Sequence, residues 1–164
     1  MSNHRGASSN SQTPALDPSF VYSEFDGCSD VVVVANNKAR TEMLSILVPV
    51  DRKWFPGASR PVTVDLVKPP HGVQVQIEVF TSGRHNWPCS DLGDWGGPDV
   101  KSSGVTWVAR AGRLMVIAGT MSRMGDYPVT VTLTNAVFEA PTGKQVRPKG
   151  PVIIKTRAGR IVGG

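Results

Sequence analysis

The chain has 164 residues, of which 40% are hydrophobic and 19% are charged, and its formal net charge is +5. The length is typical of a single domain, and no run approaches the ~18 apolar residues of a membrane-spanning helix. No apolar stretch follows Arg5 near the N-terminus, so neither a signal peptide nor a membrane partner is expected. An intracellular chain keeps Cys28 and Cys89 as free thiols, whereas in a secreted chain they are the only possible disulfide. We therefore expect free thiols.

The hydrophobic pattern has a period of two along most of the chain. Strict alternation between apolar and polar side chains occurs at 62–67, 73–80 and 129–134, which is typical of strands with one solvent-exposed face. Shorter apolar runs bounded by turn residues predict the remaining strands, at 20–25, 30–35, 43–48, 105–110, 113–119 and 152–155. Ala111-Gly112, between two of these strands, predicts a tight hairpin. Residues 37–48 also permit a short helix, which Pro49 would end.

Eight or nine short strands with short connections predict an all-β fold. Parallel strands would need crossover helices that the chain lacks, so we expect a single antiparallel β-sandwich with jelly-roll or another Greek-key topology. This sandwich is expected to span residues 19–139. Residues 1–18 are rich in Ser, Asn, Gln and Pro and have too few apolar residues to build a core, so they predict a flexible polar arm.

Residues 140–164 form a basic C-terminal segment that includes a possible last strand. The segment contains six cations and no acid, and these cations are Lys144, Arg147, Lys149, Lys155, Arg157 and Arg160. Cations without counter-charges attract the phosphates of nucleic acids whatever the base sequence, so the six residues are candidates for contact with RNA or DNA. The alternative is that they only keep the exposed edge of the last strand from pairing with another chain.

The stretch GRHNWPCSDLGDWGG, residues 83–97, follows neither a helical nor a strand pattern. Long irregular loops are usually functional, and Trp87 and Trp95 need something to pack against, so we expect them to form an interface with another subunit. The alternatives are a cap on the sandwich core and a surface that stacks on sugars. Trp95 is the expected anchor, because its neighbours in GDWGG have too little side chain to cover an indole.

Neither a metal site nor an enzyme active site is expected. This stretch and the two residues after it contain several ligand types, namely His85, Cys89, Asp91, Asp94 and Asp99, but their spacing matches no zinc or calcium motif. The histidines of the chain are His4, His71 and His85, and none lies in a pattern typical of nucleophilic catalysis. We therefore predict a protein without catalytic residues, metal or cofactor.

A polar arm, an antiparallel sandwich, a Trp-bearing loop and a basic segment together resemble the small single-jelly-roll coat proteins of icosahedral RNA viruses. The resemblance covers about residues 20–156, and phage head-decoration proteins have the same ingredients. It implies a non-enzymatic virion subunit that assembles with copies of itself or with related shell subunits and contacts the viral RNA or DNA through its cations. Near the N-terminus only His4 and Arg5 are basic, so this contact would fall to the C-terminal segment.

A second resemblance is to the accessory β-sandwich modules appended to secreted bacterial peptidases and glycosidases. Those modules carry a strand similar to GDYPVTVTL at residues 125–133. This resemblance implies the alternative function, a module that binds carbohydrate or another protein.

Overall fold

The computed structural model describes residues 16–28, 31–49, 60–81, 89 and 104–159. These residues form nine β-strands that pair antiparallel, and no helix occurs among them. The strands are β1 (Glu24–Cys28), β2 (Val31–Asn36), β3 (Glu42–Val48), β4 (Val62–Asp65), β5 (Gln74–Phe80), β6 (Gly104–Ala118), β7 (Asp126–Glu139), β8 (Gln145–Val146) and β9 (Val152–Gly159). The predicted all-β, antiparallel architecture is confirmed.

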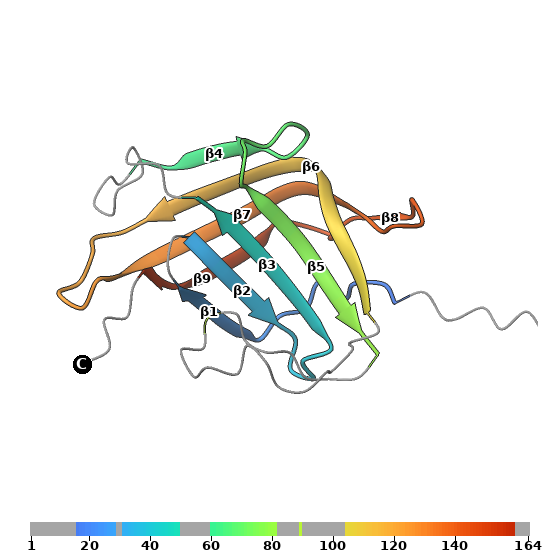
Figure 1. The fold of residues 1–164 in the computed structure, drawn as a ribbon, viewed down its shortest axis with the longest axis horizontal. Coiled ribbons are helices and arrows are strands. Elements are labelled where there is room, and N and C mark those ends of the chain that lie inside the picture. Colours follow the sequence, from blue (N-terminus) through green and yellow to red (C-terminus); the bar gives the residue numbers. More distant parts are fainter. Residues whose placement is uncertain (1–15, 29–30, 50–59, 82–88, 90–103, 160–164) are drawn as a thin grey trace, which may run out of the picture.

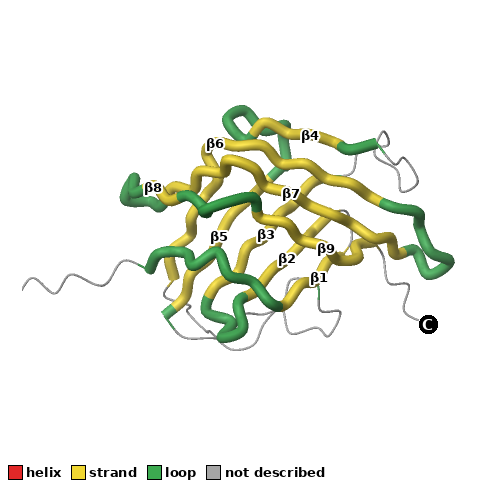
Figure 2. Tube along the Cα trace, turned by 180° about the vertical axis from the view of Figure 1, so that it is seen from behind, coloured by secondary structure: helices red, strands yellow, loops and turns green. Residues whose placement is uncertain are grey.

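All nine strands belong to one sheet. Its main path runs β1-β2-β3-β5-β6-β7-β8, while β4 pairs with β6 and β9 pairs with β7. The long hairpin of β6 and β7 joins two parts of this sheet, because β6 pairs with β5 around Trp107 and with β4 around Leu114. The sheet curls until β1 and β9 lie side by side (Figure 1, Figure 2). A nearly closed sheet thus stands in place of the two separate sheets that the sequence predicted, and a seam remains between β1 and β9.

The hairpin predicted at Ala111-Gly112 does not form, because β6 continues through both residues. The pairing of β6 with β7 shifts register at this point, as it does at a β-bulge. Gly112 has a φ of 113°, and a Cβ there would lie only 2.7 Å from the Cα of Ala136 on β7. The close approach of the two backbones therefore requires Gly in the middle of a strand, where the sequence pattern indicated a turn.

Residues 37–48 form a turn and a strand, so the helical alternative is wrong. Asn37 accepts hydrogen bonds on its side-chain oxygen from the backbone N–H groups of Thr41 and Glu42, at 2.9 and 3.1 Å, and so turns the chain from β2 into β3. The strand predicted at 20–25 begins only at Glu24. The sequence pattern does not predict β8, because its two residues are too few to show a period.

The core lies inside the curled sheet. On β5, Val75, Ile77 and Val79 are buried in it, as the alternation at 73–80 predicts. The largest fully buried side chains are those of Trp107, Phe138, Leu44, Ile46, Ile77, Leu114, Leu133 and Ile154. A smaller cluster on the opposite face consists of Val34, Met43 and Phe80, with Val32 and Cys89 packed against it.

Cys28 and Cys89 form a disulfide, so the expectation of free thiols is wrong. The two residues are 61 positions apart, and their bond ties Cys89 to the end of β1. Sequence alone could not decide this pairing, because it depends on folding bringing the two Cα atoms to within 5.3 Å.

Candidate ligand-binding groove

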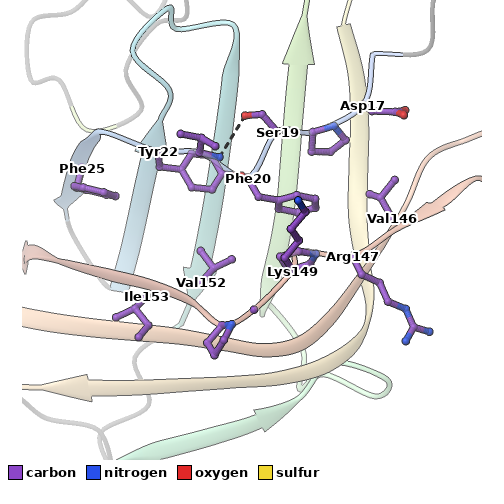
Figure 3. A pocket seen from close by; sticks show the side chains of 15 residues that line it. Asp17, Ser19, Phe20, Tyr22, Phe25, Val146, Arg147, Lys149, Val152 and Ile153 are labelled. Carbon is purple, nitrogen blue, oxygen red and sulfur yellow. Dashed lines mark hydrogen bonds between the residues drawn. The ribbon is translucent and has the colours of Figure 1, made fainter.

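A groove of about 730 Å³ opens on the surface at one end of the seam between β1 and β9. Its N-terminal wall is formed by residues 17–22, which precede β1, and by Phe25 of β1 (Figure 3). Its C-terminal wall is formed by residues 146–153, which connect β8 to β9. The groove therefore exists only because the curled sheet brings the two ends of the described chain together.

The N-terminal wall is held to the sheet by Glu42, the first residue of β3, which is 2% exposed. Its carboxylate accepts hydrogen bonds from the backbone N–H and the hydroxyl of Ser19, both at 2.7 Å. The backbone N–H of Phe20 donates a third, at 3.0 Å. A buried carboxylate is costly unless it is hydrogen-bonded, and these donors meet that requirement. Glu42 thereby positions the wall.

Two further contacts fix the start of the same wall. The indole N–H of Trp107 donates a hydrogen bond to the carbonyl oxygen of Leu16 at 3.1 Å. The ammonium of Lys144, in the turn between β7 and β8, lies 2.6 Å from a carboxylate oxygen of Asp17. About half of each charged side chain is exposed, so this ion pair contributes little to stability but does orient Asp17.

Aromatic and aliphatic side chains line the N-terminal wall, but most of the ring surface is covered. The ring of Phe20 packs against Phe138 of the core, with 5.8 Å between ring centroids. Burial raises the pKa of Tyr22 far above its usual value, and the nearby carboxylate of Glu42 adds to this shift, so the phenol stays protonated. The exposed apolar groups are Val21 and Phe25, at 68% and 43% exposure.

In the C-terminal wall, exposed and half-buried residues alternate from Val146 to Lys149. Arg147 and Lys149 are exposed, whereas Val146 and Pro148 are half-buried. The chain bends at Lys149, and the side chains of Arg147 and Lys149 extend in different directions (Figure 3). Both line the groove (Figure 3).

The groove carries uncompensated positive charge. Asp17 is the only acid among the described residues that line it, and Asp17 is engaged by Lys144. Arg147 and Lys149 form no ion pair with any residue that the structure describes. A cleft lined by charge of one sign attracts ligands of the other, so the arrangement favours an anionic ligand.

The six cations predicted to contact nucleic acid are not equivalent in the structure. Arg147 and Lys149 lie in the groove, and Lys144 lies beside it, in the pair with Asp17. Lys155 is exposed on β9. Only part of the basic segment is therefore directed at one site.

Arg157 is also on β9, but its guanidinium is paired with Asp126 of β7. The hydrogen bond from Arg157, together with one from Ser122, lowers the pKa of Asp126 to about 2. The same contact raises the pKa of Arg157. This pair lies away from the groove, and Arg160 lies outside the described residues.

The predicted interface residues Trp87 and Trp95 lie outside the described residues, as does the rest of 83–97 apart from Cys89. Among the residues considered as metal ligands, Cys89 is in the disulfide. His71 is exposed in the turn between β4 and β5. The described ranges contain no group of three or more His, Cys, Asp or Glu side chains that could hold a metal ion. Nor do they contain a helix with the length and apolar character needed to span a membrane.

The sequence analysis did not identify Glu42 or the wall that it holds. A signal was nevertheless present, because Glu42 is in phase with Leu44, Ile46 and Val48 on the core-facing side of β3. A charged residue at a core-facing position requires a buried partner. The identity of that partner, Ser19, could not be derived, since it lies 23 residues away.

Comparison with protein-family models, curated proteins and solved structures finds none that matches this chain.

Proposed function

We propose that the protein is a non-enzymatic binding protein whose groove takes an extended anionic ligand. The observation that supports this proposal is that Arg147 and Lys149 line the groove and have no ion-pair partner among the described residues. The one acid of the described lining, Asp17, is already paired with Lys144. The opposite wall is apolar, so the favoured ligand carries apolar groups beside its negative charges.

The size of the groove favours a short length of polymer. Its volume of about 730 Å³ is within the range of small-molecule sites, but such sites bury most of the ligand surface. A groove that opens on the surface between two walls leaves one side of its ligand in solvent. A chain that runs along the groove tolerates this exposure better than a small molecule does.

Fluorescence anisotropy with labelled anionic chains tests the proposal. The probes are an oligothymidylate, a sulfated oligosaccharide and an acidic peptide, and neutral dextran is the uncharged comparison. At least one anionic probe should bind, and Arg147→Gln with Lys149→Gln should weaken it about tenfold and reduce its salt dependence. The matched control replaces Lys38 and Lys68, which are exposed and outside the groove, and should leave the affinity unchanged. If both double variants lose the same amount of affinity, the binding site is not at the groove.

Our second proposal is that the protein is a self-assembling subunit of a virion shell, of the jelly-roll type. The observation that favours assembly is a group of exposed apolar side chains that line the groove, Val21, Phe25 and Ile153, at 68%, 43% and 56% exposure. Exposed apolar patches mark interaction surfaces, and viral nucleic acid would be the anionic ligand in such a shell. Light scattering after size exclusion should then show a large discrete particle. A monomer at every concentration would exclude this second proposal.

A further inference from the structure

We propose that the ligand of the groove is an extended acidic peptide segment that adds as a strand to the open edge of β9. The inference rests on the proposed function, because it names the class of anionic ligand that the groove takes. Three features of the described residues support it: an unpaired strand edge, two cations in the same groove, and few exposed aromatic side chains.

The direction of the β9 backbone follows from its pairing with β7. Pro128 lies opposite Arg157, and its carbonyl oxygen accepts a hydrogen bond from Gly119 on the other side, at 2.8 Å. In an antiparallel pair, the N–H and C=O groups of two opposite residues either bond to each other or both point away from the partner strand. The backbone groups of Pro128 point away from β9, so those of Arg157 point away from β7. Backbone direction alternates along a strand, and Ile153 therefore also directs its N–H and C=O away from β7.

Ile153 lines the groove, so these backbone groups are directed towards the seam. No backbone hydrogen bond or strand pairing joins β9 to β1 or to residues 17–23 among the described residues. An unpaired strand edge is the surface to which extended peptides add in strand-addition complexes. The seam is narrow where Gly27 packs against Arg157, so an added peptide strand can pair only with the first part of β9.

The side chains around this edge suit a peptide with acidic and apolar residues. Arg147 and Lys149 line the same groove as Ile153, so they can pair with acidic residues of a peptide that lies along this edge. Val21, Phe25 and Ile153 are exposed and offer apolar contacts to the residues between them.

Single-stranded nucleic acid is also anionic, but it needs a different kind of binding surface. Proteins bind it by stacking bases on exposed aromatic faces. In this groove the ring of Phe20 packs on Phe138, and Tyr22 is mostly buried, which leaves Phe25 as the exposed aromatic side chain of the described lining. The unpaired backbone edge and the covered rings favour peptide over nucleic acid.

The test uses labelled peptides of alternating Glu and Val, with the full chain and its R147Q/K149Q variant. One peptide is unmodified, a second is N-methylated at every Glu, and a third at every Val. The unmodified peptide should bind the parent protein and bind the variant about tenfold more weakly. Only one edge of the peptide can pair with Ile153, so one of the two methylated peptides should lose about tenfold more affinity than the other.

The remaining outcomes separate this inference from the proposed function. If both methylated peptides bind as well as the unmodified one, no backbone pairing occurs and strand addition is refuted. If oligothymidylate binds through Arg147 and Lys149 and the peptide does not, the ligand class is wrong while the proposed anionic site stands. If no anionic probe depends on these two cations, both proposals fail. Ile153→Pro provides a second measurement. It removes a backbone N–H that does not bond to β7, so it should weaken peptide binding without unfolding the sheet.

Discussion

Gly27 of β1 packs directly against the main-chain carbonyl of Arg157 on β9. A Cβ on Gly27 would overlap that oxygen, so only glycine lets the two strands come this close. The contact narrows the seam at one end and leaves the groove open at the other. One residue without a side chain therefore determines how far the groove extends.

Gly27→Ala should lower the free energy of unfolding by about 1–3 kcal/mol, because β1 or β9 must move to make room for the added methyl group. Gly150→Ala is the control, since a Cβ at Gly150 would meet no atom within 4 Å. Urea denaturation of both variants measures the difference. Equal stability of the two would show that the seam is not tightly closed at Arg157.

Glu42→Gln should detach the N-terminal wall. The variant loses the charge that accepts three hydrogen bonds from Ser19 and Phe20, at an expected cost of about 2 kcal/mol. The affinity of the groove for its anionic probe should fall as well, because the wall is part of the site. Glu24→Gln removes an exposed carboxylate paired with Arg40 and should cost less than about 1 kcal/mol. Unfolding curves and probe titrations of both variants distinguish a positioning role for Glu42 from a general effect of charge.

Reduction of the disulfide between Cys28 and Cys89 should destabilise the fold. Closing a loop between residues 61 positions apart stabilises a protein by about 4 kcal/mol in the chain-entropy model. The measurement is a denaturant midpoint with and without a dithiol reductant. The double variant Cys28→Ser with Cys89→Ser should have the midpoint of the reduced parent protein in both conditions. If the reductant does not change the midpoint of the parent protein, the two thiols are not bonded.

The ion pair between Asp126 and Arg157 predicts a definite acid dependence. The pKa of Asp126 is lowered to about 2 in the folded protein, below the ~3.9 of an unfolded chain. The pair therefore contributes stability above about pH 4, and the contribution is lost as the pH falls through the folded pKa. In Arg157→Gln, a carbon-detected NMR titration should place the pKa of Asp126 nearer its ordinary value. Arg110→Gln, which removes an exposed cation beside Glu139, should leave the pKa of Asp126 unchanged.

Local pattern was sufficient to identify most strands of this protein. The alternation at 73–80 predicts β5 because neighbouring side chains of a strand always point to opposite faces, whatever the rest of the chain does. The same reasoning predicts β7 from residues 129–134 and β4 from residues 62–67, although β4 already ends at Asp65. The absence of predicted crossover helices makes the pairing antiparallel. All-β architecture was thus determined by the sequence alone.

Tertiary structure decided whatever depends on residues far apart in the chain. Gly112 continues a strand rather than forming a turn because Ala136 approaches it, and Cys28 is oxidised because folding brings Cys89 beside it. The groove requires Glu42 to meet Ser19, 23 residues away, and Lys144 to meet Asp17, 127 residues away. Sequence pattern shows which residues are apolar or charged, but burial, ion pairing and the shape of a groove depend on the neighbours that the nearly closed sheet supplies.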